Sequence, residues 1–318
     1  MCNYTTIPLA GVAGTKLTGK SVKQNLIDSG AQFETLKAFH DKFKPDGLFT
    51  FMDLTIEAEA LGLKINLPEN DTPSVAEHPI KDKNALMELK KSYKGKSARM
   101  DVIIDVVRKM KQNIDTTIGA YVIGPFSLAG ELNGVNDLLV NTIMDTKLTE
   151  EIIDYCTEII SEYANELYKA GADTVCVLEP TAVMLSEEDY EKFSLKPFKK
   201  ILKNVNNKPL MLHICGNSTH LIEKMGQSGA CGLSLDAQVD LKGATKQIPV
   251  GMKLIGNLDP IEIFLNGDEQ LINTKTSALI EEMKDFPNFV LSSGCDLPLN
   301  TPLKNIEAFM NKAKQLNS

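Results

Sequence analysis

The stretch Pro209-Leu-Met-Leu-His-Ile-Cys-Gly-Asn217 is an apolar run that ends in His213 and Cys215 and is followed by a Gly-Asn turn. Such a run predicts a buried β-strand, in which residues i and i+2 project from the same face. We therefore expect the imidazole of His213 and the thiol of Cys215 to point together into the space that the strand end lines. Both are ligands that zinc prefers in proteins. One His-x-Cys pair is a moderate signal, so the rest of the chain has to supply a third ligand and a cavity.

Short apolar runs alternate with longer amphipathic segments along the whole chain. Their near-continuous apolar character is typical of parallel strands that are buried on both faces. The predicted strands are Ile7–Val12, Asp46–Phe51, Ile118–Ile123, Asp173–Leu178, Pro209–Ile214, Cys231–Leu235, Met252–Gly256 and Phe289–Ser292. Strand–helix alternation repeated eight times predicts an α/β fold, a (β/α)8 TIM barrel, within a single domain spanning residues 1–318. A doubly wound open sheet stays possible because a sequence does not show closure.

Helix signals fill the segments between these runs. Apolar residues recur at helical spacing from Thr149 to Leu167, and Gly171 follows as a stop signal. Ser186-Glu-Glu-Asp189 predicts the capped start of a helix that runs toward Val205. The polar stretch Glu69–Lys96 predicts an excursion between the second and third strands.

Composition excludes several classes of protein. The 318 residues are 43% hydrophobic and 24% charged, with a net charge of -8, whereas a nucleic-acid-binding protein needs a basic footprint. No run of about 18 apolar residues predicts a membrane span, and the first residues do not resemble a secretory leader. Six scattered cysteines do not form a disulfide framework, so a reducing cytoplasm is the expected location.

Arginine is scarce in this sequence. The only two, Arg99 and Arg108, fall in one predicted surface helix. A pocket that clamps many carboxylates or phosphates normally uses arginine. The 32 lysines can replace it in part, so the scarcity disfavours such a substrate without excluding it.

A third metal ligand is found at the end of the eighth predicted strand, Phe289-Val-Leu-Ser-Ser-Gly-Cys295. The carboxyl ends of all strands lie on one face of a barrel, so Cys295 is expected to meet His213 and Cys215 there. Three protein ligands with an open fourth position are typical of catalytic zinc, whereas a structural site usually has Cys-x-x-Cys hooks. Packing in the core is the alternative for any one of these residues, but the three together favour metal binding.

Other polar residues follow the predicted strands and are candidates for the same face. Glu179 and Asp236 are expected to act as a displaceable fourth ligand or to orient the metal ligands, with helix capping or loop solvation as the alternative for each. Asp53 is a third candidate for a catalytic carboxylate, and Asn257 and Asp259 are candidates for binding a cofactor. A thiolate-bound zinc with an open position favours activation of a thiol, and hydrolysis by zinc-bound water is the other standard use.

His213-x-Cys215 with Cys295 resembles the His-x-Cys…Cys zinc motif of the methylcobalamin:coenzyme M methyltransferases, a branch of the uroporphyrinogen decarboxylase superfamily. Four further stretches carry the resemblance along nearly the whole chain: Phe51-Met-Asp-Leu-Thr-Ile-Glu-Ala-Glu-Ala-Leu-Gly62, Ile123-Gly-Pro-Phe-Ser-Leu-Ala129, Leu178-Glu-Pro-Thr-Ala182 and Ile255-Gly-Asn-Leu-Asp-Pro260. The resemblance implies a (β/α)8 barrel and a methyl group passed from a methylated corrinoid (methylcobalamin) to a small thiol such as coenzyme M. It also implies a separate methylated corrinoid protein as partner, because the chain has no Asp-x-His-x-x-Gly motif.

Two other functions remain open at this point. Tetrapyrrole decarboxylases of the superfamily begin with an Arg-Gln-Ala-Gly-Arg stretch, but the matching region here is Leu9-Ala-Gly-Val-Ala-Gly-Thr15, which lacks arginine. Asp53 does match the decarboxylase aspartate that gathers pyrrole NH groups. A carboxy-lyase of this type, or a non-catalytic zinc-binding partner of a corrinoid protein, is therefore the alternative. The sulfonate of coenzyme M needs a cation or backbone amides, and the sequence identifies neither.

Overall fold

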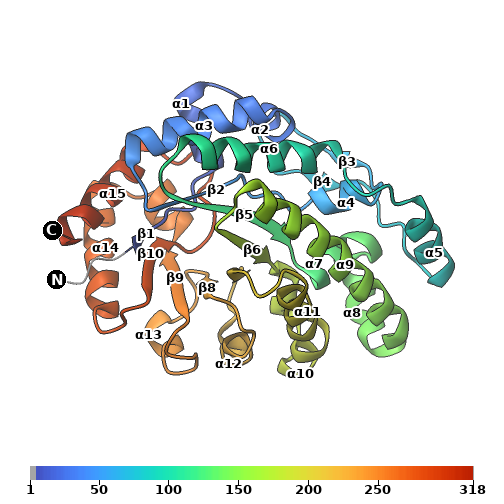
Figure 1. Cartoon of the computed structure of the whole chain (residues 1–318). Coiled ribbons are helices and arrows are strands. Elements are labelled where there is room, and N and C mark those ends of the chain that lie inside the picture. The colour runs from blue at the N-terminus through green and yellow to red at the C-terminus, as the bar shows by residue number, and fades with distance from the viewer. Residues whose placement is uncertain (1–4, 318) are drawn as a thin grey trace.

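The computed structural model describes residues 5–317, and eight of its strands form one parallel sheet. They are β1 (Thr5–Thr6), β2 (Gly47–Phe49), β5 (Thr117–Ile123), β6 (Thr174–Leu178), β7 (Leu210–Ile214), β8 (Gly232–Leu235), β9 (Lys253–Leu258) and β10 (Phe289–Ser293). Their order, β1-β10-β9-β8-β7-β6-β5-β2, follows the chain around a ring, and Figure 1 shows the first strand, β1, beside the last, β10. Between β2 and β5, the antiparallel pair β3 (Ile65–Asn66) and β4 (Ser74–Val75) lies outside this sheet.

The gap between β1 and β2 is closed by the residue that precedes β2. The backbone N–H of Asp46 donates to the carbonyl of Thr6 at 3.0 Å, and the Asp46 carboxylate accepts from the Thr6 N–H at 2.7 Å. The sheet is therefore a (β/α)8 TIM barrel, which confirms the predicted fold and excludes the open sheet.

Helices surround the barrel on its outer side (Figure 1). The α-helices are α1 (Thr15–Thr18), α2 (Val22–Ile27), α3 (Ser29–Phe43), α4 (Ile56–Ala60), α5 (Lys83–Ser92), α6 (Ala98–Asn113), α7 (Pro125–Asn133), α8 (Val135–Met144), α9 (Thr146–Ala170), α10 (Glu187–Tyr190), α11 (Lys196–Asn204), α12 (Ile222–Gly226), α13 (Leu241–Ala244), α14 (Glu269–Met283) and α15 (Leu303–Asn317). Short 3-10 or π-helical turns are η1 (Val12–Gly14), η2 (Pro180–Met184), η3 (Glu191–Leu195), η4 (Thr219–Leu221) and η5 (Pro260–Leu265). Within the described residues, no helix combines the length and apolar character needed to cross a membrane.

Local helix signals are confirmed where side chains make the caps. Gly171 ends α9 in the left-handed region at φ 116°, and Ser186 accepts a hydrogen bond from the Asp189 N–H at 3.1 Å to start α10. The helical path then continues through η3 and α11 to Val205, as predicted.

The prediction for the first strand was wrong in its position. The ladder covers Thr5–Thr6 instead of Ile7–Val12, and the chain turns into η1 at Val12. Ile7 still donates to the carbonyl of Leu291 at 2.9 Å, but the next N–H that faces β10, that of Leu9, donates to the hydroxyl of Ser293 at 3.2 Å instead of to a backbone carbonyl. The apolar character of this stretch comes from burial in the mouth of the barrel, where Leu9 and Ala10 are 5% and 6% exposed.

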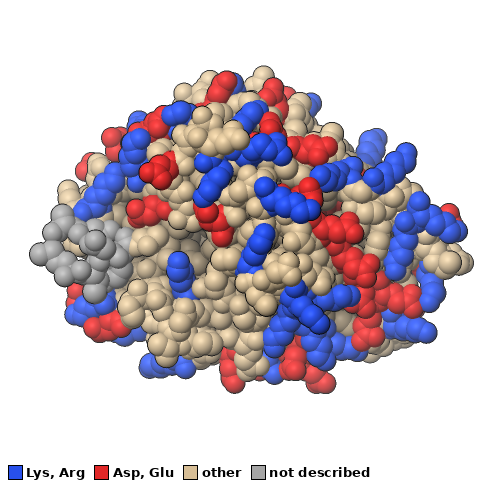
Figure 2. Space-filling view, in the orientation of Figure 1, with Lys and Arg blue, Asp and Glu red and all other residues tan. Residues whose placement is uncertain are grey.

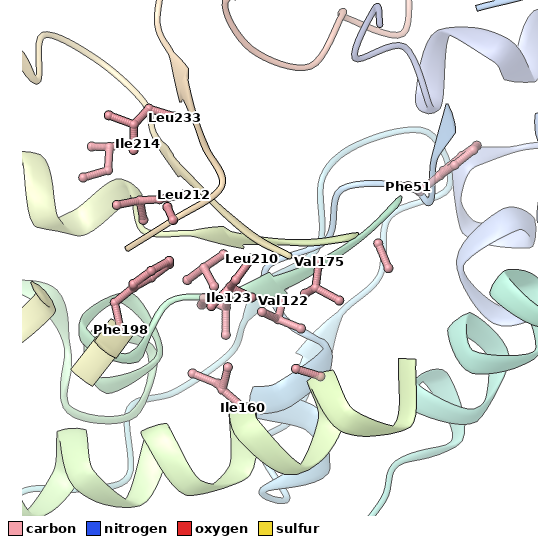
Figure 3. Close-up of a cluster of buried hydrophobic side chains, with 14 of the residues drawn as sticks. Phe51, Val122, Ile123, Ile160, Val175, Phe198, Leu210, Leu212, Ile214 and Leu233 are labelled. Atoms are coloured by element: carbon pink, nitrogen blue, oxygen red, sulfur yellow. The ribbon is translucent and has the colours of Figure 1, made fainter. Parts of the chain in front are cut away.

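Successive side chains of β7 point alternately toward the helices and into the barrel, which separates the core from the candidate site. Figure 3 shows Leu210, Leu212 and Ile214 on the side that faces the helices, and Ile160 of α9 and Phe198 of α11 are drawn among the strand side chains there. The intervening residues of β7 therefore point into the barrel, and one of them, Met211, belongs to a separate interior cluster. His213 is the next residue on that inner face.

Gly119 of β5 offers a test of interior packing. A Cβ at this position would lie 2.2 Å from the ring of Phe49, so the substitution Gly119→Ala forces that ring to move. We expect a loss of about 1–3 kcal/mol in the free energy of unfolding, measured by urea denaturation. Gly251→Ala is the matched control, because a Cβ there meets no atom within 4 Å. Equal stability of the two variants would contradict the packing described here.

Candidate metal centre

The pairing of β7 with β8 orients the imidazole of His213. His213 lies opposite Ser234 in the parallel register and is only 1% exposed. Its Nδ1 lies 3.1 Å from the carbonyl oxygen and 3.0 Å from the hydroxyl oxygen of Ser234. Because a carbonyl oxygen only accepts, Nδ1 carries the proton and Nε2 keeps a free lone pair. This is the hydrogen-bonding arrangement of a metal-ligating histidine.

Three potential ligand atoms meet in front of that lone pair. The Nε2 of His213 lies 3.0 Å from the Sγ of Cys215 and 3.7 Å from the Sγ of Cys295, and the two sulfur atoms are 3.5 Å apart. A tetrahedral zinc ion, with bonds of about 2.0–2.1 Å to nitrogen and about 2.3 Å to sulfur, holds such atoms about 3.5–3.8 Å apart. A disulfide needs a separation of about 2.05 Å, so the pair is a dithiol. The residues fit zinc by atom type, and two of the three separations match; the 3.0 Å between His213 and Cys215 is about 0.5 Å shorter than a bound ion would hold these atoms.

Cys295 reaches this position because the residue before it is glycine. The N–H of Gly294 donates to the carbonyl of Leu258 at 2.8 Å, and a Cβ on Gly294 would lie 2.5 Å from the backbone nitrogen of Ala237. The loop after β10 therefore approaches the loop after β8 more closely than any side chain at this position allows.

The two thiols influence each other's ionisation. The hydrogen bond between them is the main cause that lowers the pKa of Cys215 and raises that of Cys295, and burial adds to the rise for Cys295. Cys215 is therefore the more acidic of the two thiols.

Asp236 lies beside this centre, at the carboxyl end of β8. Its two carboxylate oxygens accept from the backbone N–H groups of Gly216 and Gln238, both at 3.0 Å, and Gly216 directly follows Cys215. The side-chain amide of Asn257 donates to the carbonyls of Asp236 and Val239 at 2.9 and 2.7 Å. Asn257 therefore holds the loop that carries Asp236, with its amide nitrogen already occupied.

Glu179 and Asp259 bind the ends of helical segments. Glu179 is 1% exposed and accepts from the N–H groups of Phe126 and Ser127 at the start of α7, at 3.3 and 2.6 Å. Burial raises the pKa of Glu179 to about 7. Asp259 accepts from the first two N–H groups that follow Pro260, at 2.7 and 2.8 Å, and so caps η5.

Asp53 forms a buried ion pair with Arg99, and the hydroxyl group of Thr55 hydrogen-bonds to both side chains. Arg99 donates to one carboxylate oxygen of Asp53. The other oxygen accepts from the backbone N–H and the hydroxyl of Thr55, at 2.8 and 2.7 Å. Asp53 and Arg99 are each 3% exposed. The predicted surface location of Arg99 was therefore wrong. It begins the predicted helix, now α6, but turns inward because a buried carboxylate needs an opposite charge. Arg108 lies on the exposed face and pairs with Asp105 at 2.9 Å.

Sequence reasoning missed four polar residues around the site. The role of Ser234 could have been predicted, because a serine between two leucines on a buried strand needs a hydrogen-bond partner. Tyr121 and Asp296 lie close enough to Cys295 that its charge helps raise their pKa values, although burial is the main cause for both. The fourth, Glu57 of α4, is fully buried, and no sequence signal separates it from the partly exposed Glu59.

The family model described as uroporphyrinogen decarboxylase (URO-D) matches residues 16–316. The chain belongs to this family.

Relatives named for two different activities resemble the chain. It is 31% identical over 269 residues to "Methylcobamide:CoM methyltransferase MtbA" of Methanosarcina acetivorans, covering 82% of this chain and 77% of that protein. It is 28% identical over 294 residues to a uroporphyrinogen decarboxylase of Prochlorococcus marinus, covering 89% and 83%. A solved structure of a methyltransferase from Methanosarcina mazei superposes with a TM-score of 0.89 at 23% identity, covering 100% of this chain and 95% of that one. At 23% identity, this last comparison shows a shared fold.

Glu57 offers a test of the buried carboxyl groups beside Asp53. Burial raises the pKa of Glu57 to about 8, one oxygen accepts from the Ile123 N–H at 3.0 Å, and the other has no hydrogen-bond partner among the described residues. The folded protein therefore holds more protons than the unfolded chain between pH 4.5 and about 8, so this group's contribution to stability falls as pH rises.

Glu57→Gln replaces the neutral carboxyl group with a neutral amide. We expect the wild type to lose stability relative to this variant as pH rises from 5 to 8, as measured by urea denaturation at each pH. Exposed Glu262→Gln is the control and leaves the slope unchanged. A wild-type profile parallel to that of Glu57→Gln would contradict the raised pKa.

Proposed function

We propose that this protein is a zinc-dependent methyltransferase that moves a methyl group from a methylated corrinoid to a thiol. The observation that carries the proposal is the convergence of the His213 Nε2 and the sulfur atoms of Cys215 and Cys295 at the carboxyl-end face of the barrel. Three protein ligands leave a fourth tetrahedral position for the acceptor thiol.

The parts of the site have distinct roles in this proposal. Bound zinc supplies Lewis acidity that makes a coordinated thiol a thiolate at neutral pH. His213, Cys215 and Cys295 hold the ion, and Ser234 fixes the imidazole tautomer. Asp236 orients the loop that follows Cys215 by accepting the Gly216 N–H. Glu179, Asp53, Asn257 and Asp259 are positioning residues, because their polar atoms already bind backbone groups or Arg99.

The transfer balances without a further reactant. A lone pair on the acceptor sulfur forms the new S–CH3 bond, the Co–CH3 bond breaks with its electron pair left on cobalt, and the thiol proton goes to solvent. The products are a methyl thioether and the corrinoid in the Co(I) state. The methyl donor is carried on a separate corrinoid protein or is free methylcobalamin.

Relatives of both activities resemble the chain, and the chemistry of the site favours methyl transfer. The MtbA relative carries the methyltransferase name, whereas the Prochlorococcus relative is a decarboxylase. A tetrapyrrole substrate brings many carboxylates that need cations, and the only buried arginine already pairs with Asp53. Decarboxylation also gives no reason for a dithiol and an imidazole in one cluster.

Zinc content tests the ligand set. We expect about one zinc per purified chain, and loss of at least 90% of it in Cys215→Ala and Cys295→Ala, because each removes one of three ligands. Cys231→Ala is the matched control: it removes a partly exposed cysteine at the amino end of β8 and leaves zinc content unchanged. Protein without affinity for zinc, or equal loss in all three variants, would contradict the assignment.

An assay of methylcobalamin separates methyl transfer from the alternatives. Zinc-loaded protein is expected to consume methylcobalamin only when a thiol is present, and Cys295→Ala is expected to reduce the rate at least 100-fold, because the nucleophile is no longer held. Uroporphyrinogen is the control substrate and is expected to lose no carboxyl group. Decarboxylation that persists in Cys295→Ala, or zinc binding without turnover of any thiol, would overturn the proposal in favour of a carboxy-lyase or a binding module.

A further inference from the structure

The cysteines in the described part of the chain have unequal surroundings. Cys156 and Cys176 are buried in the core, with exposed fractions of 0% and 1%. Cys231 is partly exposed and lies at the amino end of β8. Cys215 and Cys295 are also partly exposed, and among the described cysteines only these two are joined by a sulfur–sulfur contact, at 3.5 Å. They are therefore the one described pair of thiols placed to react with each other.

Little movement is needed to join these two sulfur atoms. A disulfide has an S–S length of about 2.05 Å, so the separation of 3.5 Å has to shorten by about 1.5 Å. Cys215 and Cys295 follow strands β7 and β10 at the mouth of the barrel, where both side chains are partly exposed. Shared between the two side chains, the movement is a modest rotation about each Cα–Cβ bond, and the strands stay in place.

Zinc binding and a disulfide between these two cysteines exclude each other. Zinc binds thiolate sulfur, and each sulfur of a disulfide has given up that negative charge to form the S–S bond. Of the three proposed ligands only His213 then remains, which is too few for a protein zinc site. The centre therefore has two possible chemical states, a reduced state that holds zinc and an oxidised state that does not.

We propose that Cys215 and Cys295 form a reversible disulfide that releases zinc, so that the metal centre is also a redox switch. This inference rests on the ligand set of the proposed function and adds a means of regulating that site. The oxidant is a hydroperoxide such as hydrogen peroxide. Hydrogen peroxide is small and neutral, so its entry does not depend on the lysine and acidic side chains that Figure 2 shows interspersed over the displayed face.

The oxidation takes place in two steps that balance. In the first, the sulfur of one cysteine attacks a peroxide oxygen, the O–O bond breaks, and a sulfenic acid and water form. In the second, the other sulfur attacks the sulfenic sulfur, the S–S bond forms, and the sulfenic oxygen leaves as water. The two sulfur atoms together give up two electrons, which reduce one hydrogen peroxide to two molecules of water. The two protons come from the thiols, or from solvent where zinc leaves as Zn2+.

Oxidation of the purified protein, with its zinc content measured beforehand, tests disulfide formation without any assumption about activity. We expect hydrogen peroxide to remove two of the six thiols, and mass spectrometry of a tryptic digest to find Cys215 linked to Cys295. Cys231→Ala is the matched control and keeps this link. In Cys295→Ala the oxidation is expected to stop at a sulfenic acid on Cys215, which dimedone traps. Unlinked cysteines, or a disulfide between other cysteines instead, would overturn the proposal, and if a variant fails to fold, the wild-type digest alone decides.

Zinc release from the same samples tests whether the disulfide excludes the metal. In zinc-loaded protein we expect about one zinc per chain to enter solution as the disulfide forms, detected with a colorimetric chelator, and reduction with tris(2-carboxyethyl)phosphine to restore zinc binding. Zinc released only with sulfinic acids, or no disulfide in protein that binds zinc, would overturn the switch and leave the proposed methyl transfer standing. Zinc retained by the disulfide form, or a disulfide in protein that never binds zinc, would overturn the ligand set and with it both proposals.

Discussion

The parallel pairing of β7 with β8 is the constraint on which the candidate site depends. It sets His213 opposite Ser234 on the inner face of the barrel, so the sheet itself supplies the partner for Nδ1. The direction of Nε2 therefore follows from the strand register and not from a mobile loop. A slip of one residue would turn the imidazole into the layer between strand and helices, where Leu212 and Ile214 now pack.

The loops at the mouth of the barrel are held by carboxylates that bind backbone N–H groups. Asp236, Asp259 and Glu179 each fix one loop or helix start in this way. This arrangement rigidifies the mouth. The buried Arg99 pairs with Asp53 in the same way, inside the protein.

The barrel could be predicted from the sequence because buried parallel strands are recognisable apolar runs. The three proposed ligands could be predicted to lie together because the carboxyl ends of all barrel strands lie on one face of the barrel. The first strand could not be placed correctly, since the end of its ladder depends on partners far away in the chain, the carbonyl of Leu291 and the hydroxyl of Ser293. Arg99 was misplaced because a helical pattern does not reveal a buried carboxylate on another element. Asp259 and Asn257 were predicted to bind a cofactor, and only the structure shows that their polar atoms hold local backbone.

X-ray absorption at the zinc edge tests the central claim most directly. For zinc-loaded protein alone, the account predicts two sulfur scatterers at about 2.3 Å and one imidazole nitrogen at about 2.0–2.1 Å, with a light atom in the fourth position. On addition of an acceptor thiol it predicts three sulfur scatterers at the same distance. Zinc without sulfur ligands, or a sulfur count that does not change when the thiol is added, would contradict it.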